Sequence, residues 1–519
     1  MDATVTVWGR CSHTVRRHTL HSDPEGCSKC APDSGGRPAT LAAAFGAAVL
    51  ASCTSDAPTP AIDRRPTDAI ASPVSGMVDI CHHAASGAMI IRVAAAALPA
   101  HLAQGDYLTT LSVSHDPAAP IDGAHFERIG DALAAARAGR LNRGELVSAD
   151  CRITIDVAPG IVRGTANQTT DPSLEHFPLI VDVPDISLQG ALQMRVDDDG
   201  RATGDGLGDA ATTVTPADPL PIVNGVSTPI IIANGHPGAS AANGLTVAGF
   251  VFQSGHAADA DAGGQGLLAI RVAGLTIRGN RFEGGFTEAM DLRASSADVL
   301  TNHLSGDGGT CDICLAGPGS YRAEGNRILA GGIEGILDFA TVNLPLPDVV
   351  EPFVLPASAE TWADVSNNEV RDHQRLPVGA GIRVGVIGTS APNVHGIVHT
   401  MFRNNLVSNN RFGMIVDAGF PVAGTDLAGD ADLTFHGNII EQSCQAPLLV
   451  SLSRHTTALG LANAPYLMNS TFQLSLNGDL NWADVWFSHP AGFGNTLIVD
   501  GVSIPNGSRQ FYDATKVCS

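Results

Sequence analysis

Five charged residues in the second half of the chain are candidates for chemistry. Asp291 and Arg293 stand in AMDLRA, Asp312 in CDICLA, Arg383 in GIRVGV and Asp417 in GMIVDA. A cluster of carboxylates with arginine is the set of groups that polysaccharide cleavage needs, and paired acids serve hydrolysis of the glycosidic bond. We therefore treat these five residues as candidate catalytic residues, provided that the fold brings them to one face.

Whether the five residues lie close together depends on which side chains of each short strand point to the same face. Aligning the segments on their leading residues places Asp291 and Arg383 in neighbouring rows, with Asp338 of GILDFA as a further member and Arg293 and Asp417 beside them. A slip of one residue sends every side chain of a strand to the opposite face. The alternative interpretation is that these residues are solvated charges, or ion pairs between turns of the chain.

The elements that would position these residues are short and repeated. LTVAGFVF at 245–252, LTIRGNRF at 275–282 and LTFHGNII at 433–440 share alternating apolar residues around a Gly/Asn corner. Between corners lies a second short apolar segment without helical spacing. Two or three brief strands per repeat, with no helix between them, predict a coil in which each strand pairs with its counterpart one turn away. The predicted fold class is all-β, a parallel β-helix.

The corner asparagines have a physical reason. Asparagine tolerates the left-handed backbone of a sharp corner, and amides stacked in register can hydrogen-bond one another. We predict such a ladder, with ordinary solvent-facing turn residues as the alternative. Its members would be Asn280, Asn302, Asn326, Asn368, Asn405 and Asn438.

The corner pattern resembles the right-handed β-helix superfamily that includes pectate lyases and pectin methylesterases. FERIGDALAAARAG at 126–139 has the apolar face of an amphipathic helix. Two strand-rich segments follow it, in an order similar to the opening of many such β-helices. The resemblance implies that this helix caps the open end of the coil, whose unpaired edge would otherwise template aggregation. We place the β-helix with its cap at 81–475 and a C-terminal cap at 476–519.

The resemblance also limits the chemistry. Uronate elimination by lyases of this superfamily uses a Ca²⁺-binding acid group with an arginine base, which the candidate cluster would suit. A lysine base is excluded across the repeats, because no lysine lies between Lys29 and Lys516. The motifs of polygalacturonases and pectin methylesterases are not recognisable. No catalytic residue is therefore carried over from the superfamily.

An acidic, glycine-rich loop is a candidate metal site. DDDGRATGDGLGD at 197–209 contains Asp197, Asp199, Asp205 and Asp209, and oxygen-rich loops of this kind bind Ca²⁺. The loop lacks the first aspartate of the EF-hand spacing and the glutamate at its twelfth position. A Ca²⁺ site is one interpretation, and a solvated insertion between coils is the other. The sequence indicates no further cofactor.

The N-terminal region has the features of an export signal. LAAAFGAAVLAS at 41–52 is uncharged, shorter than the roughly 20 apolar residues of a membrane-spanning helix, and suited to a signal peptide. Its end, with Cys53, resembles the lipobox of bacterial lipoproteins, in which the cysteine is lipidated. We expect a leader at 1–52, lipidation of Cys53 and a Pro-rich linker at 53–80. A short buried helix with a free cysteine is the alternative.

Six cysteines follow Cys53, and an even number in an exported chain favours disulfides. Sequence order suggests one pairing, although other pairings remain open. The suggested bonds are Cys81–Cys151, Cys311–Cys314 and Cys444–Cys518.

The charge balance restricts the partners. The net charge is −22, and an acidic surface repels nucleic acid, so no nucleic-acid partner is expected. The expected protein is exported and lipid-anchored at the outer membrane or cell surface. Two functions remain open. One is a rigid module that binds polysaccharide or another cell-envelope glycan; the other is a carbohydrate-active enzyme, a lyase or hydrolase, that uses the carboxylate/arginine cluster.

Overall fold

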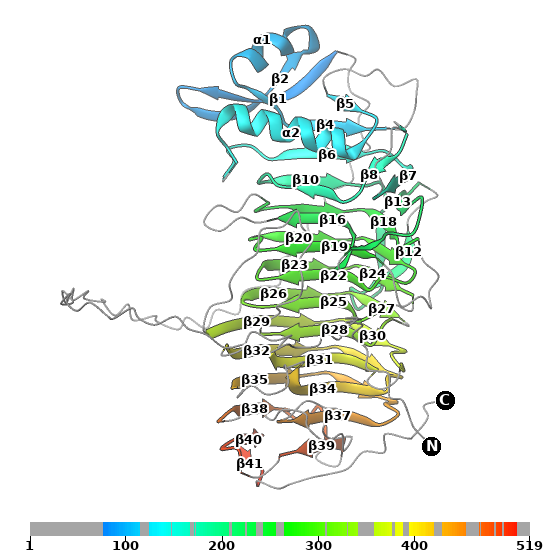
Figure 1. Ribbon diagram of the computed structural model, residues 1–519, viewed down its shortest axis with the longest axis vertical. Helices are drawn as coiled ribbons and strands as arrows, with labels where there is room; N and C mark the ends of the chain where they lie inside the picture. Colours follow the sequence, from blue (N-terminus) through cyan, green and yellow to red (C-terminus); the bar gives the residue numbers. More distant parts are fainter. Residues whose placement is uncertain are drawn as a thin grey trace, which may run out of the picture. The chain divides into compact units, whose positions relative to one another are not determined.

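A computed structural model describes residues 76–505 with gaps, and Figure 1 shows its successive strands stacked as rungs. The positions left out within this range are 115–123, 147, 167–170, 172, 207–209, 224–225, 235–241, 256–263, 307–308, 330, 341–357, 376–378, 388–393, 420–427, 453–466, 468, 482–483 and 490–491. The described part is a right-handed parallel β-helix, as the sequence predicts.

Strands of successive turns form three long sheets among the described residues. Sheet 1 contains β5 (His125–Phe126), β4 (Thr110–Val113), β6 (Ile153–Val157), β10 (Ile186–Gln189), β17 (Thr246–Ala248), β20 (Leu275–Arg278), β23 (Ser296–Leu300), β26 (Gly319–Glu324), β29 (Ser358–Ser366), β32 (His395–Arg403), β35 (Gly429–His436), β38 (Thr471–Ser475), β40 (Thr496–Val499) and β41 (Val502–Ser503). Sheet 2 contains β8 (Glu175–His176), β7 (Gly160–Thr165), β13 (Thr212–Pro216), β18 (Phe250–Gln253), β21 (Arg281–Glu283), β24 (His303–Ser305), β27 (Arg327–Leu329), β30 (Glu369–Arg371), β33 (Leu406–Ser408) and β36 (Ile439–Glu441). Sheet 3 contains β9 (Leu179–Val181), β16 (Pro229–Asn234), β19 (Gln265–Ile270), β22 (Glu288–Arg293), β25 (Cys311–Ala316), β28 (Glu334–Phe339), β31 (Ala380–Ile387), β34 (Phe412–Gly419), β37 (Ala446–Ser451) and β39 (Val485–Ser488).

Each turn of the coil passes through sheets 3, 1 and 2 in that order. β19, β20 and β21 make one turn, and β22, β23 and β24 make the next, paired in parallel with their counterparts. The pairing continues past residue 475, where β39 joins β37 and β40 joins β38. β41 then folds back antiparallel on β40 and ends the described part of sheet 1.

The predicted asparagine ladder runs along the corner between sheets 1 and 2. The side-chain amide of Asn280 donates to Oδ1 of Asn302 at 3.1 Å, and the same bond links each member to the next, as far as Asn438. Asn438 donates to Asp479 at 2.7 Å, which closes the series. Every member is buried, so these are not solvent-facing turn residues. Each such amide also donates to a backbone carbonyl of the sheet 1 strand one turn earlier, for example Asn326 of the corner after β26 to Val299 of β23.

The sharp bend itself is made by the residue before each ladder asparagine. Gly279 has φ 61° and Gly437 has φ 70°, and Gly249, at the same corner one turn before Gly279, has φ 75°. Thr301 and Asn404 adopt this left-handed conformation too. The ladder asparagines do not, which corrects the expectation that they occupy the left-handed position themselves. Their role is to hydrogen-bond between turns.

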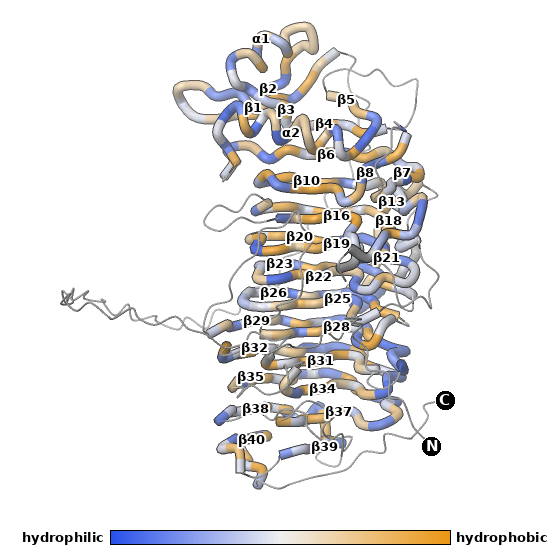
Figure 2. The backbone as a smooth tube through the Cα atoms, viewed as in Figure 1, coloured by the Kyte–Doolittle hydropathy of each residue, from blue (hydrophilic) through white to orange (hydrophobic). Residues whose placement is uncertain are grey.

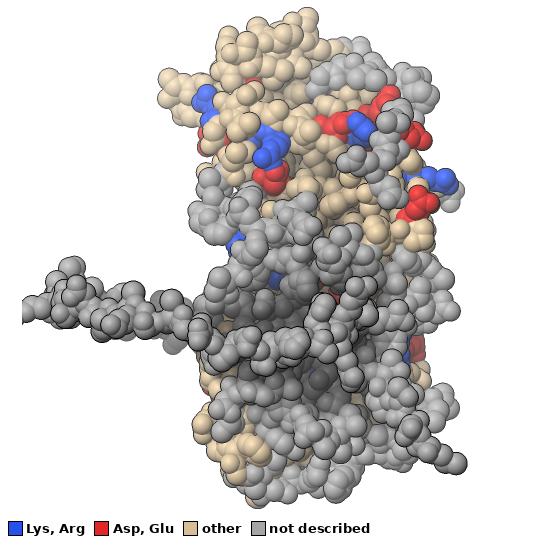
Figure 3. Space-filling view, in the orientation of Figure 1, with Lys and Arg blue, Asp and Glu red and all other residues tan. Residues whose placement is uncertain are grey.

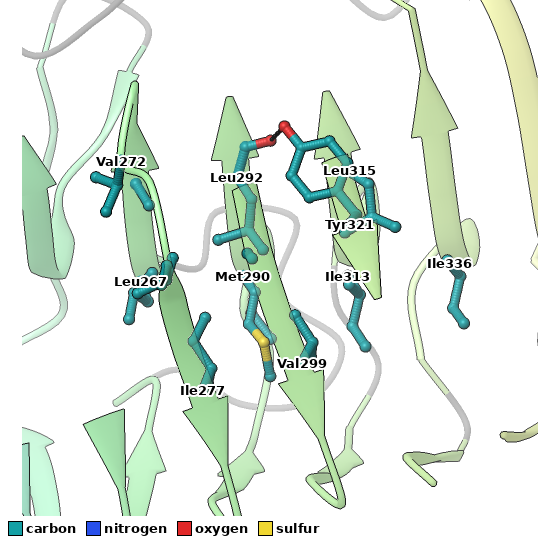
Figure 4. Close-up of a cluster of buried hydrophobic side chains, with 14 of the residues drawn as sticks. Leu267, Val272, Ile277, Met290, Leu292, Val299, Ile313, Leu315, Tyr321 and Ile336 are labelled. Carbon is teal, nitrogen blue, oxygen red and sulfur yellow. Dashed lines mark hydrogen bonds between the residues drawn. The ribbon is translucent and has the colours of Figure 1, made fainter. Parts of the chain in front are cut away.

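Apolar side chains fill the inside of the coil. Figure 2 shows the hydrophobic residues concentrated in strands such as β10, β16, β19 and β20. Figure 4 shows Leu267, Met290 and Ile313 from successive strands of sheet 3 beside Ile277 and Val299 from sheet 1. All five are fully buried members of one continuous core. Like side chains therefore meet like side chains along the column, the packing expected of a solenoid.

A small subdomain precedes the first turn. β1 (Met77–Ala84) pairs antiparallel with β2 (Gly87–Ala94) and with β3 (Tyr107–Leu108), and a short 3₁₀ turn, η1 (Ala95–Ala97), leads into α1 (Leu98–Ala103). Two further hairpins leave the coil. They are β11 (Met194–Val196) with β12 (Ala202–Gly206), and β14 (Ile222–Val223) with β15 (Val226–Ser227).

The predicted capping helix is α2 (Ile129–Arg143). It begins three residues later than the sequence pattern indicates, because Phe126 belongs to β5. Ile129, Leu133 and Ala136 are buried against the first turns, and Glu175 accepts backbone N–H groups at the start of the helix. Figure 3 shows acidic and basic side chains lying next to one another in this N-terminal part of the β-helix. None of the helices that the structure describes is long and apolar enough to cross a membrane.

Candidate functional site

The strands of sheet 3 turn several rows of side chains away from the coil axis, and the row of Asp291 is one of them. Met290 of β22 points into the core, and the following residue, Asp291, points outward. The register of the described strands places ten side chains in this row, so that Asp291 and Arg383 share it. Its members are Ile180, Ile232, Leu268, Asp291, Cys314, Leu337, Arg383, Ile415, Leu449 and Trp486.

A first charged cluster, the Glu288 cluster, consists of Gln265, Glu288, Asp291 and Arg293 on β19 and β22. The Gln265 amide donates to Oε2 of Glu288 at 3.0 Å and to Oδ2 of Asp291 at 3.1 Å. Nε of Arg293 donates to both oxygens of Asp291 at 3.0 Å. All four residues are buried. The cluster therefore holds two carboxyl groups beside one guanidinium.

The environment of Glu288 favours its protonated form. Burial raises the pKa of Glu288 to about 7, and the nearby charge of Asp291 acts in the same direction. A carboxyl group with a pKa close to neutrality can give up or accept a proton at physiological pH. The Glu288 cluster thus contains one group suited to acid–base chemistry.

A second charged cluster, the Arg383 cluster, consists of Glu334, Arg383 and Asp417 on β28, β31 and β34. Nη1 of Arg383 donates to Glu334 at 2.9 Å, and Nη2 donates to Asp417 at 2.9 Å. All three side chains are completely buried. Burial raises the pKa of Glu334 to about 7, although the positive charge of Arg383 opposes this shift. The arginine serves as a counter-ion to two carboxyl groups.

The two clusters are separate. Asp291 lies on β22 and Arg383 on β31, three strands further along sheet 3, a distance of roughly 14 Å at the usual strand spacing of about 4.8 Å. The Cys311–Cys314 disulfide, Leu337 and Phe339 lie between them as an apolar patch. The residues predicted as one cluster therefore form two buried sets, each with its own ion pair.

Asp312 lies inside the coil, which corrects its place among the outward residues. Its Oδ2 is 3.1 Å from Nε2 of the fully buried His373, whose Nδ1 is 3.2 Å from Oδ1 of Asn410. The cause is a local irregularity, because the second residue of the sheet 3 strands drops out of the ladder and faces inward. At the equivalent Gly335, a Cβ would collide with Val370 of sheet 2.

Asp338 also points inward and not onto the outer face. Its neighbours in the ladder are Leu315 and Val384 of the core, and its Oδ2 accepts a hydrogen bond from the Thr400 hydroxyl at 2.6 Å. Burial raises the pKa of Asp338 to about 7. The predicted alignment of GILDFA with GIRVGV is confirmed, because Leu337 pairs with Arg383. Asp338, the fourth residue of GILDFA, therefore lies on the core side of its strand, as Leu292 does on β22.

The described part of the acidic loop forms a tight turn. Oδ1 of Asp197 accepts the backbone N–H groups of Asp199 and Arg201, and Asp199 pairs with the Arg201 guanidinium at 3.1 Å. Arg201 also donates to the carbonyls of Asn367 and Asn404, which holds the β11–β12 hairpin against the corners. The side chains of Asp205 and Asp209 lie outside the described residues. The Ca²⁺ site therefore stays a prediction.

Two of the suggested cysteine pairs are present as disulfides, Cys81–Cys151 and Cys311–Cys314. Cys444 is disulfide-bonded as well. Cys53 and Cys518 lie outside the described residues.

The outer face of sheet 1 differs from that of sheet 3 because it is open to solvent. Trp362 of β29 is 53% exposed. Its ring stacks on His399 of β32, with centroids 4.0 Å apart and planes 13° apart. His399 in turn contacts Glu360 at 3.1 Å. An exposed indole is thus held in a fixed orientation by its neighbour.

A pocket of about 330 Å³ lies on the same face. Ser320 of β26, which lines the pocket, is the direct ladder neighbour of Trp362. Arg322 and Asp364 form the next ladder pair, and Asp364 is bound to Arg403. The pocket thus combines hydroxyl, carboxylate and guanidinium groups beside an aromatic ring. Its polar lining residues are Ser296, Asp298, Ser320, Arg322 and Asp364.

This face was not predicted from the sequence, although β29 carries a signal for it. In SAETWADVS the buried positions up to Val365 are the alanines, Thr361 and Val365, and they alternate with exposed or half-buried Glu360, Trp362 and Asp364. A tryptophan among the polar, outward positions of a regular strand marks an exposed ring. Such a residue is a candidate for ligand contact rather than for the core.

Comparison with protein families finds no match, and comparison with curated proteins finds none either. Among solved structures, a periplasmic alginate epimerase is 12% identical and similar over 67% of this chain and 77% of its own, with a TM-score of 0.31. A surface adhesin of Streptococcus pneumoniae is 10% identical over 75% and 91%, with a TM-score of 0.35. An endo-xylogalacturonan hydrolase from Aspergillus tubingensis is 11% identical over 73% and 90%, with a TM-score of 0.35. These identities and TM-scores carry no argument about function, and the parallel β-helix of this chain is defined by its own strand pairing.

Proposed function

We propose that the protein is an exported β-helix module that binds a polysaccharide or another cell-envelope glycan on the outer face of sheet 1. The observation that carries the proposal is the exposed Trp362, oriented by His399 next to the polar pocket around Ser320 and Arg322. Two of the structures named above, the alginate epimerase and the endo-xylogalacturonan hydrolase, are named as enzymes that act on polysaccharides.

The chemistry of this face suits sugars. The C–H faces of a sugar ring pack against an aromatic ring, which presents a large and rigid apolar surface. Sugar hydroxyls both donate and accept hydrogen bonds, so they match serine hydroxyls, carboxylates and a guanidinium. A pocket with a few convergent polar groups fixes the orientation of a ligand. Because the outward positions of successive strands lie in rows, a polymer lying along the column would meet one side chain after another, such as Ser320, Trp362 and His399.

Export and anchoring are part of the proposal. They rest on the uncharged segment 41–52 and on Cys53, which follows it in the manner of a lipobox. Display at the outer membrane or cell surface would place the sheet 1 face among envelope glycans. Mass spectrometry of the N-terminal peptide of the mature chain tests the anchor. A Cys53 without lipid would contradict the proposed anchoring.

The decisive variant is Trp362→Ala. Loss of a central aromatic contact commonly costs 2 kcal/mol or more of binding free energy, so we expect glycan affinity to fall by at least about tenfold. The matched control is Ile439→Ala on β36 of sheet 2, which is 57% exposed and lies on another face. A glycan array identifies the polysaccharide that is bound, and calorimetry then measures its affinity for the two variants and the unmodified protein. Equal affinity of Trp362→Ala and the unmodified protein would contradict the proposed surface.

The Glu288 cluster is the basis of a second candidate function. Its buried carboxyl groups, one with a pKa of about 7, beside Arg293 are compatible with a carbohydrate-active enzyme, a lyase or hydrolase. Incubation with a polysaccharide panel, with and without Ca²⁺, tests it through reducing ends and unsaturated-uronate absorbance. We expect no product, because the clusters are buried and paired. Product formation that Glu288→Gln abolishes would establish the enzyme instead.

A further inference from the structure

We propose that the N-terminal subdomain contains a binding site for a divalent transition-metal ion of the zinc class, formed by His82, His101 and Asp106. The site is independent of the proposed glycan surface. His82 lies in β1, His101 in the last turn of α1, and Asp106 immediately before β3. Two histidines and one carboxylate are a ligand set that zinc accepts in proteins.

The fold brings the three residues together for identifiable reasons. β1 and β3 are antiparallel neighbours with Cys81 opposite Tyr107, so the next residue of β1 faces the residue before β3. The Cys81–Cys151 disulfide ties this point of β1 to the segment that follows α2. The turn after α1 is closed by the backbone N–H of Asp106, which donates to the carbonyl of His101 at 3.1 Å. The geometry is therefore fixed by backbone pairing and a covalent bond.

The ligand atoms already converge. Nδ1 of His82 lies 2.9 Å and Nδ1 of His101 lies 2.8 Å from the same oxygen, Oδ2 of Asp106. The two rings meet edge to face, with centroids 5.8 Å apart. Ligand atoms around a tetrahedral ion at bond lengths of about 2.0–2.1 Å are about 3.3 Å apart. Outward shifts of a few tenths of an ångström would thus open room for an ion between the three atoms.

The surroundings support binding from solvent. The Asp106 side chain is 3% exposed, whereas those of His82 and His101 are 31% and 23% exposed, so an ion can reach a carboxylate held out of water. The other oxygen of Asp106 accepts the backbone N–H of His83 at 3.2 Å. Outer hydrogen bonds of this kind orient a ligating carboxylate. Three protein ligands would leave a fourth position for water or another ligand.

A neighbouring set fits an ion less well. His83 contacts Glu145 at 2.9 Å and Asp150 at 3.3 Å. Glu145, however, already accepts hydrogen bonds from the Tyr107 hydroxyl at 2.7 Å and from the Arg140 guanidinium at 2.9 Å. A metal there would compete with a buried arginine. Among the described residues, Asp106 forms ion pairs with the two histidines and with no arginine, which singles out its site.

The test uses the full chain after removal of metal with a chelator. Because Cys11, Cys27 and Cys30 could themselves bind zinc, all versions carry serine at these three positions. Calorimetry with Zn²⁺ and absorption spectra with Co²⁺ are compared for this background, His82→Gln, His101→Gln and the matched control His83→Gln. Thermal unfolding without metal checks that each variant is folded.

We expect one equivalent of metal in the background and in His83→Gln, with d–d bands of Co²⁺ and no sulfur charge-transfer band. His82→Gln and His101→Gln should each lose at least about tenfold in affinity, and Zn²⁺ should raise the melting temperature of the background but not of these two variants. Absence of metal binding in the background would overturn the proposal. Equal affinity in His82→Gln and the background would do so as well.

Discussion

At the scale of single residues, the coil holds carboxyl groups that burial drives toward protonation. Glu288 and Glu334 lie beside arginines on the outer face of sheet 3, and burial raises the pKa of each to about 7. Asp338 has the same raised pKa but lies in the core, where a threonine hydroxyl is its hydrogen-bond donor. Among the residues that the structure describes, no cation pairs with Asp338, so a charge there would lose its hydration without compensation. Asp338 is therefore the residue at which the effect of pH on stability is clearest.

Replacement of Asp338 by asparagine should stabilise the protein at alkaline pH. The folded state binds the Asp338 proton more tightly than the unfolded chain, so the contribution of the protonated carboxyl is complete below about pH 4 and is lost as the pH rises through about 7. A rise from 3.8 to about 7 corresponds to a loss on the order of 4 kcal/mol. Asparagine keeps an acceptor for Thr400 and has no charge to bury.

Denaturant unfolding at a series of pH values measures this difference. We expect the free energy of unfolding of Asp338→Asn to exceed that of the unmodified protein by a few kcal/mol at about pH 8 and to equal it near pH 4. Asp218→Asn, at an exposed position, is the control and should leave the free energy of unfolding unchanged at both pH values. A variant that is less stable than the unmodified protein at alkaline pH would show that Asp338 is not a destabilising charge.

At the scale of elements, the asparagine ladder connects the turns. Asn326 donates to Val299 and Asn368, and its own oxygen accepts from the backbone and side chain of Asn302. All of these groups are buried, so each would lose its partner without access to water. The ladder is therefore a means of fixing one turn onto the next.

Asn326→Ala should be strongly destabilising. Buried groups left without a partner cost about 1–3 kcal/mol each, so we expect the free energy of unfolding to fall by about 3 kcal/mol or more. Asn481→Ala, at an exposed position outside the ladder, should change it by less than about 0.5 kcal/mol. Denaturant midpoints compare the two. Similar small changes in both variants would mean that the ladder does not contribute to stability.

The elements were predictable to different degrees. The Gly/Asn corners and alternating apolar residues predict the coil, because a repeated local pattern must occupy a repeated environment. Which residues of a sheet 3 strand face the core was not predictable. One residue of each strand leaves the ladder, so that Asp312 faces the core together with its neighbour Ile313. The separation of Asp291 from Arg383 depends on the number of strands between them. The stacking of Trp362 on His399 depends on register across two strands, which no local pattern fixes.

At the scale of the whole molecule, the two broad faces of the column differ. The outer face of sheet 3 carries acids and arginines that are buried and paired with each other. The outer face of sheet 1 carries solvated side chains, an oriented indole and a pocket. A binding surface must be reachable by its ligand, which favours sheet 1. The pairs of the Arg383 cluster are better explained as contacts between successive turns, and the Asp291–Arg293 pair as a contact within β22.

A crystal structure of the protein with an oligosaccharide from the polysaccharide that it binds tests this account most directly. We predict a sugar ring packed on the Trp362 indole and sugar hydroxyls hydrogen-bonded to Ser320, Arg322 or Asp298 in the adjoining pocket. An oligosaccharide seated on the Glu288 or Arg383 cluster, with the sheet 1 face empty, would contradict the proposed docking surface and point to the enzyme instead.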